Sequence, residues 1–199
     1  MEIDDGMIVS RRQFVAGTVA LAALPARALA TVDEDRLRLI AHRELSRSKS
    51  AIWLRDTVGI ADFSRPSNEP RFFVIDMVAG KVRPFLVAHG RGSDPEHEGL
   101  VRKFSNEFES LASSRGAFLT HTWYDGIHGR SMRLAGLDHD NSNAEARAIV
   151  IHGAWYANPD MVGKWGKLGR SDGCFAFGEA DIATILARLG KGRLLYAGR

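Results

Sequence analysis

The chain has 199 residues, with 27 Lys and Arg against 24 Asp and Glu, one Cys and 45% hydrophobic residues. This length supplies one domain with a sizeable core, and the composition excludes a disordered or collagen-like chain. The formal net charge of +3 forms no basic run, so nucleic acid is not an expected partner. A single Cys excludes an intramolecular disulfide and a zinc site of the usual Cys/His spacing, and we expect no metal.

Residues 1–30 contain the parts of a signal peptide in order. The sequence S-R-R-Q-F at residues 10–14 precedes an uncharged run at 15–24, and the small-residue pattern Ala28-Leu29-Ala30 follows. The run is too short to span a membrane, so we expect cleavage after Ala30 and no stable membrane anchor. The pair Arg11-Arg12 resembles a twin-arginine signal, which implies export by the twin-arginine machinery to the periplasm.

After the signal, the chain is expected to begin with a helix and to continue mainly as strands. Apolar residues at helical spacing predict a helix over residues 33–45, within an N-terminal helical segment of residues 31–56. Runs rich in Val, Ile and Phe predict strands, many in an antiparallel meander, at 57–62, 71–78, 82–89, 117–124, 131–137 and 147–152. A helix over 179–189 and a closing strand over 193–197 complete the one expected domain, residues 57–199, which is mainly β.

One motif near the C-terminus matches the nucleophile elbow G-x-S-x-G of serine hydrolases. It spans Gly169 to Gly173 and has Ser171 at its centre. In α/β-hydrolases the catalytic His follows the Ser, whereas the last His of this chain is His152, upstream of Ser171. The predicted strands also disagree with a doubly wound sheet, so a Ser171 hydrolase is kept only as an alternative.

Cys174 is a better candidate nucleophile in the same segment. A thiol needs a nearby base, and His152, at the end of an apolar strand, is rigidly mounted to act as one. Backbone N–H groups of Gly173 and Cys174 could form an oxyanion hole. On the residues alone, the alternative that Cys174 is a small buried core residue stays open. The export signal favours a use for the thiol, because an oxidising compartment exposes free thiols to oxidation.

Two segments resemble the catalytic core of the YkuD-type L,D-transpeptidases, and the resemblance is greatest to the murein L,D-transpeptidase catalytic domain-like family. They are I-V-I-H-G-A-W-Y at 149–156 and G-R-S-D-G-C-F-A at 169–176. Further blocks match in order at 87–93, 104–106, 113–118 and 124–137, so the resemblance covers about residues 57–197. It implies a mainly β fold of the sandwich or barrel type, with a cleft over the Cys and a helix after it.

The resemblance also implies a reaction and roles for individual residues. In such enzymes a thiolate attacks the carbonyl of the third residue of a peptidoglycan stem peptide and expels D-Ala, and the acyl group then passes to an amine or to water. Carried over, Cys174 is the nucleophile, His152 is the general base and then acid, Gly173 supplies an oxyanion N–H, and Ser171 shapes the turn. No cofactor is implied.

The remaining matched residues are expected to bind the substrate. They are Gly153, Trp155, Tyr156, Arg170, Asp172, His128 and His89. The sequence departs from the family at Asp172, where many members have His, and at Phe175-Ala176, which replaces Ile/Val-Arg. Arg170 could supply the missing Arg contact. An L,D-carboxypeptidase or endopeptidase, in which water resolves the same acyl-enzyme, and a non-catalytic envelope-binding module stay open as alternatives.

Overall fold

The computed structural model describes residues 33–48 and 50–199, so the expected signal peptide lies outside the described residues. The described part contains three α-helices, α1 (Glu34–Arg47), α2 (Asp160–Trp165) and α3 (Ile182–Leu189), and three short 3-10 turns, Arg91–Ser93, His139–Asn141 and Trp155–Ala157. None of the described helices is long and apolar enough to cross a membrane.

The described strands form one eight-stranded sheet, in the order β3-β2-β1-β8-β4-β5-β6-β7. Their bounds are β1 (Thr57–Asp62), β2 (Phe72–Asp76), β3 (Val82–Phe85), β4 (Gly116–Gly126), β5 (Gly129–Gly136), β6 (Val150–Gly153), β7 (Phe175–Phe177) and β8 (Leu194–Gly198). The sequence-based expectation of a mainly β fold, with an N-terminal helix and a helix after Cys174, is confirmed.

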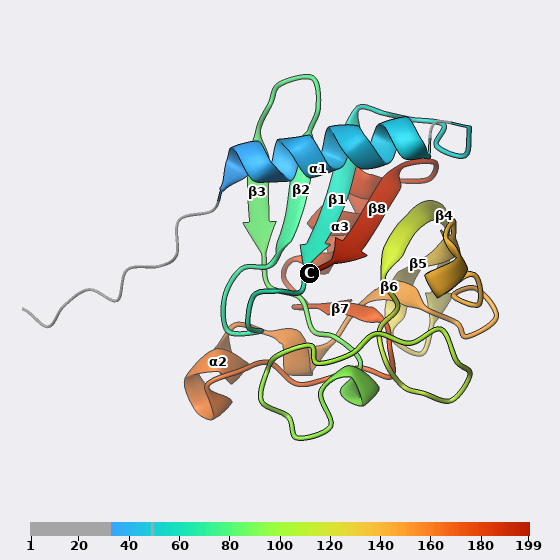
Figure 1. Cartoon of the computed structure of the whole chain (residues 1–199). Helices are drawn as coiled ribbons and strands as arrows, with labels where there is room; N and C mark the ends of the chain where they lie inside the picture. The colour runs from blue at the N-terminus through green and yellow to red at the C-terminus, as the bar shows by residue number, and fades with distance from the viewer. Residues whose placement is uncertain (1–32, 49) are drawn as a thin grey trace, which may run out of the picture. The chain divides into compact units, whose positions relative to one another are not determined.

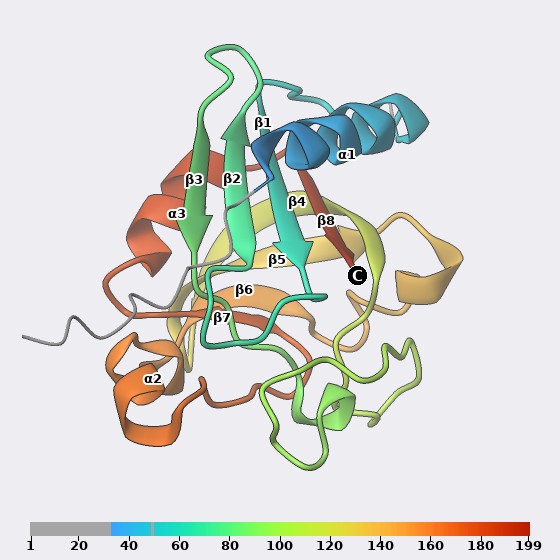
Figure 2. The same ribbon diagram turned by 60° about the vertical axis from the view of Figure 1, so that its left-hand side comes forward.

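The chain's last strand joins two antiparallel groups. β1, β2 and β3 form one meander and β4, β5 and β6 form the other, while β8 pairs in parallel with β1 and antiparallel with β4. The first group runs crosswise to the second, and the single sheet therefore turns a corner at β8 and β4 (Figures 1 and 2). The sequence predicted neither β7 nor α2, which are three and six residues long.

Two helices cover opposite faces of the first group of strands (Figure 1). α1 begins where the Asp33 carboxylate accepts a hydrogen bond from the Arg36 N–H at 2.9 Å, and it buries Leu37, Ala41 and Leu45. It lies over β1 and β8, and Arg36 forms an ion pair with Asp62 of β1 at 2.9 Å. α3 packs on the other face against β1, β2 and β6.

A large buried cluster lies between α3 and the sheet and includes five Phe rings. The Phe72 and Phe177 ring centroids are 4.7 Å apart, and those of Phe118 and Phe175 are 5.6 Å apart. Successive side chains of a strand point to opposite faces. Because Phe175 and Phe177 face this core, Cys174 and Ala176 face the other side of the sheet, where Ala176 joins a smaller apolar cluster with Met161 and Leu168.

Candidate active site

The parallel pairing of β6 and β7 brings the predicted nucleophile and base to one face. Ile151 pairs with Phe175 and His152 pairs with Ala176, while Cys174 directly precedes β7. Since side chains alternate along each strand, His152 and Cys174 are diagonal neighbours on the face away from the Phe core.

The Cys174 thiol is partly buried and has a backbone acceptor. Sγ donates to the Ala148 carbonyl at 3.5 Å, and Ala148 holds a left-handed conformation with φ of 54°. Burial raises the pKa of the Cys174 thiol above its ordinary value, and the Asp172 charge adds to the rise, whereas the Val150 N–H and the Arg147 charge oppose it. The resting group is therefore a neutral thiol at neutral pH.

His152 has one ring nitrogen fixed by the backbone. Its Nδ1 lies 2.9 Å from the Gly153 carbonyl oxygen, which can only accept, so Nδ1 carries the proton and Nε2 has the free lone pair. Burial lowers the pKa of His152, and a positive charge on His128 would lower it further, while the Gly153 carbonyl opposes this. The residue is 2% exposed, so its imidazole is neutral near pH 7 and suited to accept a proton.

His128 is placed beside His152 by the hairpin that joins β4 and β5. The two imidazole rings stack with centroids 4.2 Å apart and an interplanar angle of 22°. His128 and Gly153 also line a cavity of about 400 Å³ beside the hairpin, together with Trp123, Arg130, Glu179, Ile182 and Leu186. Two of the predicted substrate-binding residues thus border one mostly apolar cavity next to the base.

The turn before β7 is held by the Ser171 side chain. Ser171 Oγ donates to the Cys174 carbonyl at 2.7 Å and accepts from the Gly173 N–H at 3.2 Å. Gly173 has φ of +119°, and a Cβ there would lie 2.7 Å from the Ile149 Cδ1 atom and 2.9 Å from the Ala112 carbonyl oxygen. Only glycine fits this position without displacing a neighbour. Because the Gly173 N–H is bonded to Ser171, it is already engaged in this structure.

Two residues that sequence reasoning did not select contact the same turn, and a third, Arg147, holds the residues 105–114 together. Ser113 Oγ donates to the Gly173 carbonyl at 3.2 Å, and Arg91 forms an ion pair with Asp172 at 2.8 Å. Arg147 donates to the Ser105 and Ala112 carbonyls, both at 2.7 Å, and to the hydroxyls of Ser110 and Ser114. Arg91 and Ser113 lie within the matched blocks, but nothing in the sequence indicates their partners.

Tyr156 is a predicted substrate residue whose phenol is partly buried. Burial raises the pKa of the Tyr156 phenol, and negative charge on Asp172 or on an ionised Cys174 would raise it further. Its carbonyl accepts from the Gly169 N–H at 2.8 Å, which ties this ring to the segment that leads to Ser171. Trp155 beside it is 58% exposed.

Two other predicted substrate residues are occupied by contacts within the protein. His89 is 1% exposed, and its ring nitrogens lie 2.6 Å from Arg71 Nη2 and 3.3 Å from Asp94 Oδ2. Burial and the Arg71 charge lower the pKa of His89 to about 3, so this ring is neutral and lies behind the turn. Arg170 donates to the carbonyls of Asp94 and Pro95.

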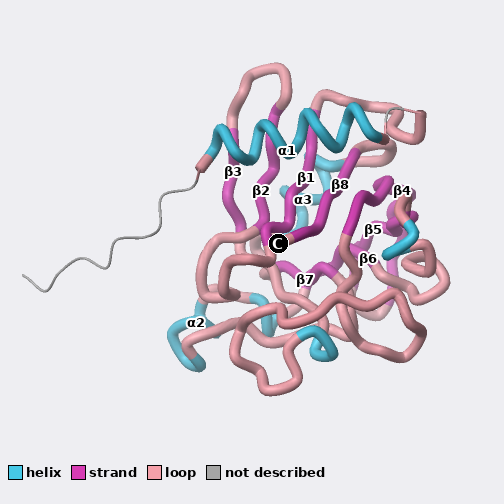
Figure 3. The backbone as a smooth tube through the Cα atoms, viewed as in Figure 1, coloured by secondary structure: helices cyan, strands magenta, loops and turns pink. Residues whose placement is uncertain are grey.

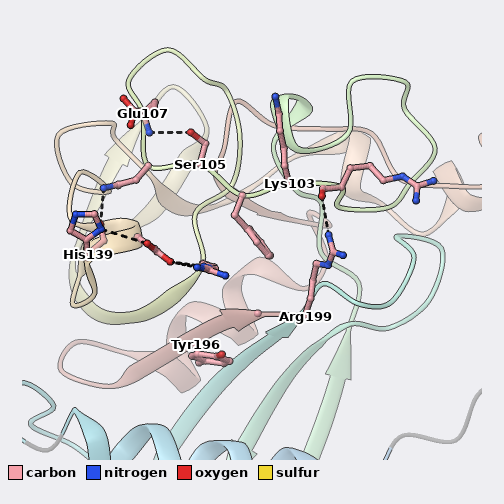
Figure 4. Close-up of a pocket in the computed structure, with 12 residues that line it drawn as sticks. Lys103, Ser105, Glu107, His139, Tyr196 and Arg199 are labelled. Atoms are coloured by element: carbon pink, nitrogen blue, oxygen red, sulfur yellow. Dashed lines mark hydrogen bonds and ion pairs between the residues drawn. The ribbon is translucent and has the colours of Figure 1, made fainter.

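A cavity of about 700 Å³ contains none of the predicted site residues (Figure 4). Its lining is mainly charged and polar and includes Lys103, Ser105, Glu107, His139, Tyr196 and Arg199. Its Arg115 is paired with Asp140 at 2.5 Å, and Arg199 donates to the Val101 and Arg102 carbonyls at 3.0 Å. Within the described residues, no three His, Cys, Asp or Glu side chains are grouped to hold a metal ion.

Several of the solved structures to which this chain is similar are L,D-transpeptidases of mycobacteria. One from Mycobacterium smegmatis has 16% identity and a TM-score of 0.43, with 72% of this chain and 59% of that chain covered. One from Mycobacterium tuberculosis H37Rv has 14% identity and a TM-score of 0.47, with 72% and 58% covered. L,D-transpeptidase 3 from Mycobacterium tuberculosis, in complex with a faropenem-derived adduct, has 13% identity and a TM-score of 0.47, with 72% and 60% covered. The match thus spans less than two thirds of each of these chains.

No curated protein sequence matches the chain. A family model described as the L,D-transpeptidase catalytic domain matches residues 31–197, which is nearly the whole chain. This match confirms the resemblance first carried by the segments around His152 and Cys174. The chain belongs to the L,D-transpeptidase catalytic domain family.

Proposed function

We propose that this protein is a cysteine acyltransferase that carries out L,D-transpeptidation on peptidoglycan stem peptides. The observation that carries the proposal is the placement of a neutral thiol and a neutral imidazole on one face of the β6–β7 pair. The family to which the chain belongs supports the reaction type.

In the first half-reaction, Cys174 Sγ attacks the carbonyl carbon of the third stem residue while His152 Nε2 takes the thiol proton. The carbonyl oxygen becomes an oxyanion, for which we assign the Cys174 N–H as a donor, since Ser171 engages the Gly173 N–H. Collapse of this intermediate breaks the bond to D-Ala, whose nitrogen receives the proton from His152. A thioester on Cys174 and free D-Ala result.

In the second half-reaction, the amine of another stem peptide attacks the thioester and passes its proton to His152 Nε2. Collapse releases the new amide and a thiolate, which recovers its proton from His152. Water in place of the amine gives the carboxypeptidase outcome by the same steps. Tyr156 and the cavity bordered by His128 and Gly153 are proposed to bind the stem peptides.

We also propose that residues 1–30 export the protein to the periplasm through the twin-arginine pathway, and that residues 57–199 carry the chemistry. The basis is the order of Arg pair, uncharged run and small-residue pattern in the sequence. α1, within residues 31–56, packs on β1 and β8 and thus supports the same sheet.

The first prediction concerns the products of the purified residues 31–199. Incubation with disaccharide-tetrapeptide should release D-Ala and give cross-linked dimer, and Cys174→Ala should lower D-Ala release at least a thousandfold because the thioester cannot form. Liquid chromatography with mass spectrometry separates dimer from tripeptide. Equal D-Ala release by folded Cys174→Ala would contradict the mechanism, and tripeptide without dimer would indicate a carboxypeptidase.

The second prediction concerns pH. Burial lowers the pKa of His152 below its ordinary value of about 6.5, so the base stays mainly neutral at pH 6.5. The rate of D-Ala release should therefore fall only at lower pH. The raised pKa of Cys174 keeps the thiol protonated through neutral pH, so kcat/KM should be flat between about pH 6.5 and 8.5. A kcat/KM that rises tenfold per pH unit across this range would show that preformed thiolate is required.

The third prediction uses a β-lactam as a probe of the nucleophile. The L,D-transpeptidase 3 structure contains a faropenem-derived adduct, and we expect faropenem to acylate Cys174 by opening its β-lactam ring. Intact-protein mass spectrometry should show a covalent mass increase in the wild-type protein and none in Cys174→Ala. An unmodified wild-type mass after prolonged incubation would favour a non-catalytic binding module.

The fourth prediction concerns export of the full chain in a bacterium with a twin-arginine system. The wild-type protein should appear in the periplasmic fraction and begin at Thr31, whereas Arg11→Lys with Arg12→Lys should remain uncleaved in the cytoplasm. Immunoblots of the two fractions provide the measurement. Equal processing of both proteins would overturn the proposed route.

A further inference from the structure

The segment of residues 154–170 connects the two strands that carry the candidate catalytic groups. It leaves β6 after Gly153, contains a 3-10 turn and α2, and returns to the turn at Ser171. Figure 3 shows it at the edge of the fold beside β7. Whatever this segment presents to solvent is therefore next to the candidate active site.

The segment is firmly attached to the sheet. Ala154, Ala157, Met161 and Leu168 are buried and form one cluster with Ala176, on the face that also carries Cys174. α2 closes with the Gly166 N–H donating to the Val162 carbonyl at 2.9 Å. The backbone that carries the exposed side chains of this segment is thus fixed and is not a loose loop.

Two Trp side chains of this segment are exposed side by side. Trp155 is 58% exposed and Trp165 is 46% exposed, and their rings meet edge to face with centroids 6.0 Å apart at 74°. Aromatic rings of this size normally contribute to a core, so a rigid exposed pair indicates a contact with something outside the chain.

A third ring connects this pair to the segment that leads to Cys174. The Tyr156 ring lies edge to face with Trp155, with centroids 5.9 Å apart. A Cβ at Gly169 would lie 2.6 Å from the Tyr156 Cβ, so the absence of a side chain there allows the ring to pack against the segment leading to Cys174. Three aromatic rings therefore run from the segment that leads to Cys174 outward to the surface.

The position of the substrate's sugar matches this path. The acyl group that reaches Cys174 belongs to the third residue of the stem, and the first residue is joined to an amino sugar of the glycan strand. Three extended residues span at most about 10 Å, so a sugar lies near the thiol whenever a stem peptide is bound. Sugar rings have C–H faces that pack on indole rings, and the nearby Lys164 is paired with Asp160 at 2.8 Å, which leaves little net charge.

We propose that Trp155 and Trp165 form a platform that binds a sugar ring of the glycan strand carrying the donor stem peptide. The inference rests on the proposed function, since the thiol must act on a stem peptide for the sugar to lie here. Such a platform would make the enzyme prefer stem peptides that are linked to the glycan over free peptides.

The test compares two donors that differ only in the sugar. We expect kcat/KM for D-Ala release to be about tenfold higher with disaccharide-tetrapeptide than with the bare tetrapeptide, the effect of about one stacking contact. In Trp155→Ala and Trp165→Ala this ratio should fall at least fivefold. Trp53→Ala removes an equally exposed Trp, 57% exposed, that contacts His121 and Lys191, and it should keep the wild-type ratio.

A wild-type ratio near one, or a ratio unchanged in both variants, overturns the platform while D-Ala release still supports the proposed function. If the wild-type protein releases no D-Ala from either donor, the proposed function fails. A separate measurement of sugar binding then tests whether the two Trp residues form a platform. For that measurement, N-acetylglucosamine tetramer is titrated into Cys174→Ala with and without Trp165→Ala, and calorimetry records the heat. We expect Trp165→Ala to weaken binding at least fivefold, and equal affinity or no binding in both proteins overturns the platform.

The same variants test the alternative that the Trp pair contacts a second copy of the chain. If the platform were a contact between two copies of the chain, light scattering would show a dimer that Trp165→Ala converts to a monomer. That result would overturn the sugar platform. Thermal unfolding of each variant shows whether the change leaves the fold intact.

Discussion

The pairing of β6 with β7 is the contact on which the candidate active site depends. The pairing is short, with His152 opposite Ala176, yet it determines which side chains of β6 and β7 lie on the same face of the sheet. Phe175 and Phe177 are drawn into the main core, where burial of each ring stabilises the fold by about 1.5–3 kcal/mol. Alternation then requires Cys174 to lie on the opposite face with His152. The position of the thiol is therefore a consequence of the core. A shift of one residue in this register would bury the thiol in the core and expose the Phe rings.

Behind the turn that precedes Cys174, a cluster of buried polar groups fixes the position of the 87–94 segment, which the apolar core alone does not fix. Arg71 is fully buried, and burial lowers the pKa of its guanidinium to about 9. It donates to the Val87 carbonyl at 2.8 and 3.0 Å and contacts His89, whose other nitrogen faces Asp94. The His89 carbonyl accepts from the Ser171 N–H at 2.9 Å, so the cluster ends at the turn that presents Cys174. A buried charge is tolerated only when its donors are satisfied, and these contacts therefore hold the 87–94 segment in one position. We infer that His89 supports the turn and does not touch the substrate.

Local pattern was enough to predict much of the fold, and pattern together with the family resemblance indicated the central pair of the candidate site. The apolar spacing of α1 and the β-rich runs of β1, β4 and β5 are signals that lie within each segment. The signal for β7 is only three residues long, and the insertion of β8 between β1 and β4 depends on contacts between distant segments. Arg147 illustrates the same limit, since its acceptors lie 33 to 42 residues away in the sequence. The sequence gives no indication that Trp165 and Trp155 form a pair, because their contact exists only in the fold. A sequence motif identifies functional residues that are close together in the sequence. Residues that support the site or bind the substrate come from distant segments, and only the fold brings them together.

The electrostatics of the site favour a pair that is neutral at rest. Burial raises the pKa of Cys174 and lowers that of His152, so each group is pushed away from its charged form. An ion pair in this position would require both charges to leave water before any substrate is present. A neutral thiol avoids that cost, and it also resists oxidation because the thiolate is the form that oxidants attack. In the mechanism that we propose, proton transfer to His152 Nε2 accompanies attack on the substrate carbonyl, and a thiol of raised pKa gives a sulfur that is intrinsically more nucleophilic. The burial that suppresses the reactivity of the free thiol would then supply a strong nucleophile once the substrate is bound.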